Sequence, residues 1–351
     1  MISLVNKIKT ARQTALAVLE AVFSEGAYSN IALNQTLLEV PLSSADKGLV
    51  TEIVYGTVAR KITLEWYLSH VIKDRDKLDS WLYILLLMSL YQIQYLDKIP
   101  AHAVVNEAVE LAKVRKKGSE KFANAVLRRL LRNGVADIGS IKRKNKRYSI
   151  QYSLPVWLVK VLIEEYGEKR ALAIFKSLFL RNKASVRVVD LSRKEELKQV
   201  LQAEDSLLAP SALVKSHGHF AGHAVFEEGA IAIQDESSQL VAPTLELRGD
   251  EKVLDACSAP GGKTMHIASY LTTGQVTALD LYEHKLALIK ENAQRLGVAD
   301  KVITKKLDAR KVFETFGADA FDKILVDAPC SGIGLIRRKP DIKYNKKNAD
   351  F

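Results

Sequence analysis

The residue types that could bind a ligand gather in one stretch, from Asp255 to Thr264. A short apolar segment ends at Asp255, a turn with two adjacent glycines follows, and Met265 to Leu271 has the pattern of a helix. A strand, a turn and a helix in this order place backbone N–H groups at the carboxyl edge of a strand, where anions and nucleotides bind. The next apolar segment ends at Asp280, about where a carboxylate accepts hydrogen bonds from ribose hydroxyls. The stretch therefore predicts a ligand with one anionic end and one ribose.

Three ligands could occupy such a unit. A dinucleotide favours G-x-G-x-x-G, whereas Gly261 and Gly262 are adjacent. A phosphate-binding P-loop favours G-x-x-x-x-G-K-[ST], and the sequence supplies its last three residues together with a Walker B-like strand at 323–327. However, Cys257 stands where the first glycine of that loop belongs, and Pro260 removes an N–H donor. The third ligand is S-adenosylmethionine, whose carboxylate and ribose need fewer donors.

The segments around this stretch predict an α/β domain. Four apolar segments predict strands, each ending at or one residue before an aspartate: Lys252–Leu254, Gln275–Leu279, Val302–Leu307 and Phe321–Val326. Helical patterns lie between them, at Met265–Leu271, His284–Leu296 and around Lys311–Thr315. This alternation predicts a parallel, doubly wound sheet with its site at the carboxyl ends of the strands. A lone aspartate after a strand is usually a helix N-cap, but four at successive strand ends indicate a function.

The first part of the chain, from Lys7 to about Asn133, has helical patterns separated by turn signals. Apolar residues at helical spacing predict buried stripes: Val104, Ala108 and Leu111, then Phe122, Val126, Leu127 and Leu130. The most apolar run, Trp81 to Leu96, is about 16 residues long, which is short of the roughly 20 that span a bilayer. It predicts a buried helix of a soluble protein.

The charge of the chain indicates a polyanionic partner. The formal net charge is +11 and the pI is about 9.4, which favours nucleic acid. Basic residues are dense in and after the last predicted helices of the first part: Lys113, Arg115, Lys116, Lys117, Lys121, Arg128, Arg129, Arg132, Lys142, Arg143, Lys144, Lys146 and Arg147. A single charge is usually only a solvated group, but this density predicts a surface that contacts phosphates.

A smaller mixed region lies between Tyr148 and about Gly229. Its patterns predict helices and strands in the order Pro155–Tyr166, Glu168–Phe179, Ala184–Val189 (strand), Lys194–Gln202 and Ala230–Gln234 (strand). One loop contains His217, His219 and His223, which together could hold a metal ion. Because no cysteine or carboxylate is close by, we predict a polar loop and no metal site.

The motifs resemble those of a known family. Asp255 to Lys263, Asp280, Asp308 and the run Asp327 to Gly332 resemble the cofactor and target motifs of RNA cytosine-C5 methyltransferases, the Fmu/Sun group that modifies bacterial small-subunit ribosomal RNA. Residues 101–110 and 121–129 resemble the NusB-like helical domain that precedes the methyltransferase domain in this group. The resemblance covers most of the chain, and it implies RNA binding by the helical domain.

The resemblance implies three parts: an all-α NusB-like RNA-binding domain (1–145), a small α/β RNA-contacting module (146–230) and a Rossmann-like class I methyltransferase domain that uses S-adenosylmethionine (231–351). The expected cofactor-binding residues are Cys257, Ser258, Ala259, Pro260, Gly261, Gly262, Lys263, Asp280, Asp308 and Asp327. The turn would offer backbone donors to the methionine carboxylate, and Asp280 would accept the ribose hydroxyls. Asp308 would stand beside the adenine, and Asp327 would border both the cofactor and the target base.

The two cysteines differ in their expected roles. Cytosine C5 is a poor nucleophile, so its methylation requires a thiolate that first attacks C6. From its position after the fourth strand, Cys330 is the natural candidate, whereas Cys257 lies in the cofactor turn. In the family, however, the nucleophile belongs to a later Thr-Cys motif, and the cysteine matching Cys330 assists product release. The sequence reaches Phe351 without that motif and without three further strands, so we expect a C-terminally truncated enzyme that binds RNA without turnover.

Other functions remain open from the sequence. The RNA could be a transfer RNA or another RNA instead of 16S ribosomal RNA in an unassembled or partly assembled small subunit. The chain could also be a non-catalytic RNA-binding or ribosome-assembly protein, or a P-loop nucleotidase. The N-terminus shows no export signal, and two distant cysteines fit reduced thiols, so we expect a cytoplasmic location and no membrane association.

Overall fold

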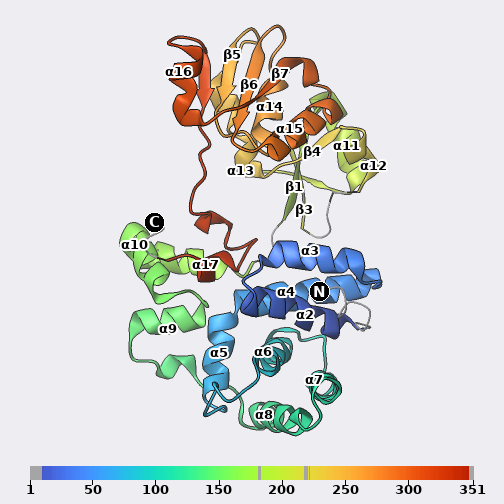
Figure 1. Ribbon diagram of the computed structural model, residues 1–351, viewed down its shortest axis with the longest axis vertical. Helices are drawn as coiled ribbons and strands as arrows, with labels where there is room; N and C mark the ends of the chain where they lie inside the picture. The colour runs from blue at the N-terminus through green and yellow to red at the C-terminus, as the bar shows by residue number, and fades with distance from the viewer. Residues whose placement is uncertain (1–9, 181–182, 217–219, 221, 348–351) are drawn as a thin grey trace. The chain divides into compact units, whose positions relative to one another are not determined.

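The computed structural model describes the residues 10–180, 183–216, 220 and 222–347. Contacts divide the chain into two compact units (Figure 1). The first unit comprises 1–180 and 331–351, and the second comprises 181–330. Among the described residues, no helix combines the length and the apolar character needed to cross a membrane.

The first unit is helical, as predicted. Its helices are α2 (Ala11–Ser24), α3 (Ser29–Glu39), α4 (Ser44–Ala59), α5 (Lys61–Ser69), α6 (Ser80–Tyr95), α7 (Ala101–Arg115), α8 (Ser119–Asn133), α9 (Lys144–Gln151), α10 (Val156–Ser177) and α17 (Ile342–Asn345). Local sequence explains where they begin. At α2, the Thr10 hydroxyl accepts from the Gln13 amide at 3.2 Å, while the Gln13 side chain accepts from the Thr10 amide at 3.2 Å. This reciprocal pair satisfies two N–H groups that the first turn leaves free.

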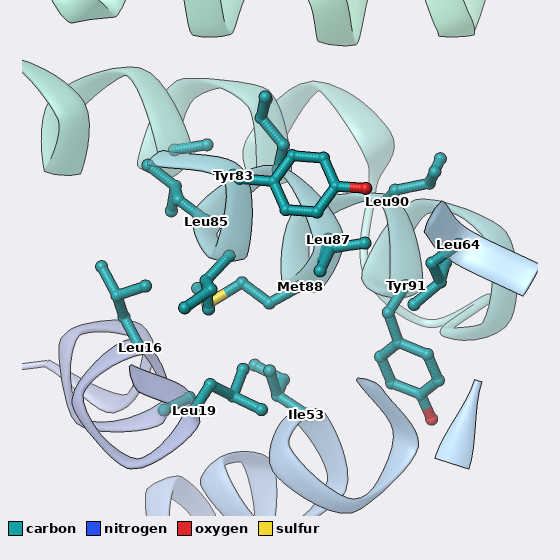
Figure 2. Close-up of a cluster of buried hydrophobic side chains, with 14 of the residues drawn as sticks. Leu16, Leu19, Ile53, Leu64, Tyr83, Leu85, Leu87, Met88, Leu90 and Tyr91 are labelled. Atoms are coloured by element: carbon teal, nitrogen blue, oxygen red, sulfur yellow. The ribbon is translucent and has the colours of Figure 1, made fainter. Parts of the chain in front are cut away.

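Helix α6 lies at the centre of the helical core (Figure 2). Its residues 82–92 are all buried, and Leu85, Leu86 and Leu90 are fully inaccessible. A helix that is apolar on every side must be covered on every side, and α2, α4, α5, α7 and α8 contact it. The prediction of a buried helix in this run is therefore confirmed.

The amphipathic helix α8 differs from the prediction at one position. Val126, Leu127 and Leu130 are buried as expected, but Phe122 is 39% exposed. Phe122 is one residue from the buried Ala123, so it lies at the edge of the apolar face. Its ring faces partly outward because the core contacts only the centre of that face.

The segment after Cys330 packs against the helices of the first unit. Ile336 is buried in a cluster with Phe175 of α10, and the Tyr344 hydroxyl donates to the Val58 carbonyl at 2.7 Å. Helix α10 contains a break at Gly167, whose φ of 72° is open to glycine at little cost. The break confirms the two helices predicted on either side of this residue.

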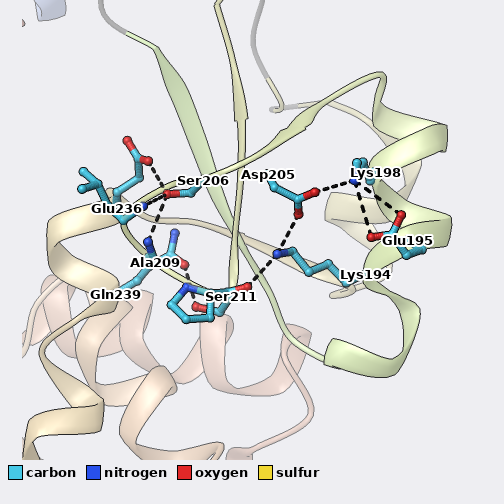
Figure 3. Close-up of polar contacts among 11 residues, drawn as sticks. Lys194, Glu195, Lys198, Asp205, Ser206, Ala209, Ser211, Glu236 and Gln239 are labelled. Carbon is cyan, nitrogen blue, oxygen red and sulfur yellow. Dashed lines mark hydrogen bonds and ion pairs between the residues drawn. The ribbon is translucent and has the colours of Figure 1, made fainter.

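The second unit begins with a small antiparallel sheet. Its strands are β1 (Ala184–Val188), β2 (Glu204–Asp205), β3 (Ala212–Lys215) and β4 (Ile231–Ile233), in the order β2-β3-β1-β4, and its helices are α11 (Lys194–Leu201), α12 (Ala224–Glu227) and α13 (Glu236–Gln239). Figure 3 shows how side chains attach the short β2 strand. Asp205 accepts from Lys194 at 2.8 Å and also pairs with Lys198, both on α11. The predicted strands at β1 and β4 and the predicted helix at α11 are confirmed; β2 and β3 were not predicted.

The rest of the second unit is a parallel sheet with helices. Its strands are β5 (Lys252–Asp255), β6 (Gln275–Asp280), β7 (Val302–Lys306) and β8 (Lys323–Leu325), and its helices are α14 (Gly262–Ala268), α15 (Glu283–Arg295) and α16 (Val312–Phe316). The order is β7-β6-β5-β8, and every pairing is parallel. Val253 and Val276 face the cluster that contains α14 and α15, whereas Leu254 and Leu279 face the side of α16. The predicted doubly wound sheet is therefore confirmed.

Along the chain, β6 and then β7 are added on one side of β5, whereas β8 is added on the other side of β5. The order of strand addition therefore reverses between β5 and β8. In doubly wound sheets, ligands bind in the crevice outside the carboxyl ends of the strands at such a reversal. β8 is an edge strand. Ile324 within it is 54% exposed, and Val326 directly after it is 65% exposed.

The boundaries of the three predicted parts differ from those of the two compact units. The prediction separates the parts after 145 and after 230, whereas contacts group α10 with the helical unit and β1 to β4 with the parallel sheet. Phe175 of α10 packs on Tyr152, the residue directly after α9, and their rings lie 5.4 Å apart. The three functional parts stay a prediction.

Candidate functional site

The site is built on the turn that follows β5. This strand ends at Asp255, which is 1% exposed and whose Oδ2 accepts from the Thr264 hydroxyl at 2.7 Å. The other oxygen, Oδ1, is buried without a hydrogen-bond partner. Burial raises the pKa of this carboxyl above its ordinary value, although Thr264 and the Cys257 amide act in the opposite direction. Asp255 therefore joins the end of β5 to the first turn of α14.

Neighbouring elements hold the turn in place. The Ala256 amide donates to the Leu325 carbonyl of β8 at 3.0 Å. The Ser258 amide and hydroxyl both donate to the Leu279 carbonyl of β6, at 2.9 and 2.7 Å. Because both neighbouring strands contribute, the position of the turn depends on the assembled sheet.

The two glycines have different surroundings. Gly261 has a φ of 100°, and a Cβ there would lie 3.4 Å from Ile289 of α15. At Gly262, where α14 begins, a Cβ would meet no atom within 4 Å. No side chain caps α14, so the N–H groups of its first turn lack the partners that a cap supplies. The turn thus presents backbone donors beside open space.

Four carboxylates converge on the thiol of Cys257. Burial is the main cause that raises its pKa, and the charges of Asp255, Asp280, Asp327 and Asp308 add to it. These carboxylates come from the ends of four strands, so the structure brings together the aspartates that the sequence predicted. A thiol with a raised pKa is mostly protonated at neutral pH, which makes Cys257 a poor nucleophile.

Asp280 and Asp308 are held in different ways. Asp280 accepts from the Tyr282 amide at 3.0 Å, and its carboxylate is 3.7 Å from the Lys285 ammonium group. Asp308 accepts from the Arg310 guanidinium at 2.6 Å and from its amide at 3.0 Å. These bonds lower the pKa of Asp308 to about 2. Asp308 is therefore ionised at neutral pH.

Lys263 is paired within the site. Its ammonium group forms an ion pair with Asp327, whose side chain is 54% exposed. A P-loop would direct the corresponding lysine and the next hydroxyl toward phosphates and a magnesium ion. Here Asp327 takes the lysine and the buried Asp255 takes the hydroxyl of Thr264. The arrangement weighs against a nucleoside triphosphate.

The second cysteine lies apart from the buried turn. Cys330 is exposed and lies five residues after Leu325, the last residue of β8. Both cysteines are free thiols. An exposed thiol near the carboxyl end of an edge strand is open to a macromolecular substrate. Reduced thiols match the sequence prediction.

Only one of the three loop histidines lies among the described residues. His217 and His219 lie outside the described residues. The ring of His223 accepts from the Val225 amide at 3.4 Å and caps α12. Within the described ranges, no three His, Cys, Asp or Glu side chains are grouped so that they could hold a metal.

Sequence reasoning did not predict the contact between Thr264 and the inward-facing Asp255. Their contact joins the residue that ends a strand to one nine positions later, across the turn. One feature of the sequence could have predicted this contact, because an aspartate that ends an apolar strand can be buried when a hydroxyl group donates a hydrogen bond to it. The pairing of Lys263 with Asp327 had no such feature, because 64 residues separate them.

Comparisons with known proteins agree with this geometry. Residues 242–351 match a family described as 16S rRNA methyltransferase RsmB/F, and residues 9–132 match the NusB family. The chain is 44% identical to the probable ribosomal RNA small subunit methyltransferase B of Bacillus subtilis (strain 168), over 98% of this chain and 78% of that protein. It is 32% identical to the corresponding protein of Synechocystis sp., over 97% and 78% of the two chains. The crystal structure of PH0851 has the same fold, with a TM-score of 0.75, 22% identity and coverage of 97% and 79%.

Proposed function

Because this chain belongs to the RsmB/F family of ribosomal RNA small subunit methyltransferases, we propose that it transfers a methyl group from S-adenosylmethionine to C5 of a cytosine in 16S ribosomal RNA. The observation that carries the proposal is the convergence of four strand-end carboxylates on the turn between β5 and α14. The helical first unit, with its NusB match, is the part that we assign to RNA binding.

The donors and acceptors at the turn fit this cofactor. S-adenosylmethionine supplies a methyl group on a positively charged sulfur. Backbone N–H groups at Gly262 and Lys263 would hold its carboxylate, because α14 begins there uncapped and open space lies beside Gly262. Asp280 would accept the ribose hydroxyls, since its carboxylate ends β6. Four carboxylates also favour a sulfonium cation and disfavour a triphosphate.

The basic residues of the first unit suit an RNA substrate. On α8, Lys121, Arg128 and Arg129 are exposed, while the opposite face is buried. Arg132 and the cations that follow α8 extend this charge to α9. Exposed cations of this kind contact phosphates and set the position of a nucleic acid without reading its sequence.

The reaction needs a thiolate on the side of the target base. Addition of sulfur to C6 makes C5 nucleophilic, C5 then takes the methyl group, and loss of the C5 proton with departure of the thiolate restores the double bond. Between the two cysteines, the exposed Cys330 is the one that RNA can reach. We assign it the release of the product, as the resemblance implies, and we assign the attack on C6 to neither Cys330 nor Cys257, because the resemblance places the nucleophile in a separate Thr-Cys motif.

Calorimetry of the chain with S-adenosylhomocysteine tests the cofactor. We expect binding that Asp280→Asn weakens at least tenfold, because a neutral amide forms weaker hydrogen bonds to ribose hydroxyls than a carboxylate does. Asp319→Asn is the matched control, since Asp319 lies on the loop before β8. Binding of magnesium ATP that Lys263→Ala abolishes would instead support a nucleotidase, and no binding of either ligand would support a non-catalytic RNA-binding protein.

The RNA and the role of Cys330 are tested together with RNA species that contain 5-azacytidine, which traps a thiolate on C6. Tighter binding of 16S ribosomal RNA than of transfer RNA is the expected preference, and transfer of a tritiated methyl group by this chain, lost in Cys330→Ser, would contradict the assignment of Cys330 to product release. Because the attack is assigned to neither Cys330 nor Cys257, we expect this chain to form no trapped complex. A trapped complex that Cys330→Ser abolishes would assign the attack to Cys330 itself.

A further inference from the structure

A hollow in the first unit combines an apolar floor with a cationic rim. Its volume is about 710 Å³, and residues of α5, α9 and α10 line it. Ile62 and Trp66 come from α5, and Val156 comes from the beginning of α10. Val156 is 40% exposed and Trp66 is partly accessible, so apolar surface is open to solvent here.

The cations of the rim are not neutralised by the protein. Lys144 is paired with Glu168 at 2.5 Å. The other three, Arg143, Lys146 and Lys160, are exposed, and no carboxylate among the described residues lies within ion-pair distance of them. Three free positive charges around an apolar hollow favour a ligand that carries both negative charges and a flat apolar group.

We propose that this hollow binds an unpaired nucleotide of the RNA, with its base against Trp66 and the adjoining phosphates on Arg143, Lys146 and Lys160. The inference rests on the proposed function, because it takes RNA as the substrate. Single-stranded nucleic acids are bound in this way, by aromatic side chains that stack on bases within a basic groove. A duplex keeps its bases stacked on one another and offers only its phosphates.

The size and composition of the hollow agree with this ligand. Sites for small molecules and single nucleotides commonly occupy about 300–1,000 Å³, which includes the 710 Å³ observed. An acidic peptide would satisfy the cations but would place no flat base against Trp66. The site would thus let the first unit select unpaired segments of a partly folded RNA.

The test measures binding of a short, fluorescein-labelled oligoadenylate to the full chain by fluorescence anisotropy. Trp66→Ala is expected to weaken binding roughly tenfold, about 1.4 kcal/mol, and Trp66→Phe much less, because phenylalanine can still stack. Lys146→Gln with Lys160→Gln should lower the slope of log Kd against log salt by about 1.4, since each phosphate contact in a single strand contributes about 0.7. Lys47→Gln with Lys98→Gln, two exposed lysines elsewhere in the first unit, should not lower it.

A direct readout does not depend on the stability of the alanine variant. The chain has three tryptophans, so Trp81→Phe with Trp157→Phe leaves Trp66 as the only one. Oligoadenylate should then quench the fluorescence, whereas poly-glutamate and duplex RNA should not. Absence of quenching, equal binding of poly-glutamate, or an equal loss of affinity in the control pair would overturn the proposal. Because calorimetry with S-adenosylhomocysteine reads the cofactor turn, a failure there concerns the proposed function and not this site.

Discussion

A buried ammonium group makes the stability of the first unit depend on pH. Lys343 is 2% exposed, and its Nζ donates to the Ala59 carbonyl at 2.6 Å. Among the described residues, no carboxylate lies within ion-pair distance of this group. Burial is the main cause that lowers its pKa to about 7, and the charge of Arg60 adds to the effect. The perturbation that tests this is Lys343→Met, which keeps the apolar stem and removes the charge.

The direction follows from proton binding in the two states. The unfolded chain holds the proton up to a pKa of about 10.5, whereas the folded chain loses it near pH 7. Between these values the unfolded state binds more protons, so the contribution of Lys343 to the free energy of unfolding rises with pH. Below about pH 7 both states are protonated, and the slope from this group vanishes. The difference of about 3.5 between the two pKa values corresponds to a change of about 5 kcal/mol in the free energy of unfolding over the whole pH range. About 2–3 kcal/mol of this change falls between pH 6.5 and 9.

Urea unfolding followed by tryptophan fluorescence measures this contribution, because all three tryptophans belong to the first unit. The difference in unfolding free energy between wild type and Lys343→Met should change by about 2–3 kcal/mol from pH 6.5 to pH 9, in favour of the wild type at the higher pH. Lys346→Met, three residues later and not fully buried, is the control for general titration. Parallel pH curves for wild type and Lys343→Met would refute the reasoning.

Three further predictions concern the turn after β5. Thr264→Val removes the hydroxyl that donates to the buried Oδ2 of Asp255, so the free energy of unfolding should fall by about 1–3 kcal/mol in thermal denaturation; an unchanged melting temperature would show that the hydroxyl is dispensable. Gly261→Ala forces a Cβ into a residue with φ of 100° and 3.4 Å from Ile289, so stability should fall by about 1–2 kcal/mol, whereas Gly262→Ala should affect only cofactor binding. Asp308 stays ionised from pH 5 to 8, because its pKa is about 2. It should therefore contribute no pH dependence to the affinity for S-adenosylhomocysteine in this range; a break in the pH profile that Asp308→Asn removes would contradict this.

The sequence by itself determined the local elements of the second unit. Apolar segments of three to six residues alternate with helical patterns from 252 to 326, and each became the strand or helix that its period predicts. The turn from Asp255 to Thr264 was equally legible, because glycine, proline and the strand-ending aspartate act over a few residues. Family membership followed from the same motifs, since their residue types and order are properties of the chain.

Only the tertiary structure decided which strand lies beside which. β8 pairs with β5, 70 residues earlier, and this placement brings Asp327 to Lys263. The same placement gathers the strand-end carboxylates around Cys257. No local pattern encodes such contacts, because they depend on the sheet that all four strands build together.

The destination of the segment after Cys330 was also beyond the sequence. Its few apolar residues follow neither a helical nor a strand period, so the sequence does not predict which part of the protein they contact. In the structure, Ile336 and Tyr344 pack on the helical unit. The hollow beside Trp66 likewise combines residues that are about 80 positions apart in the sequence. Local physical chemistry thus specified the elements and the cofactor turn, while packing between distant segments decided what surrounds them.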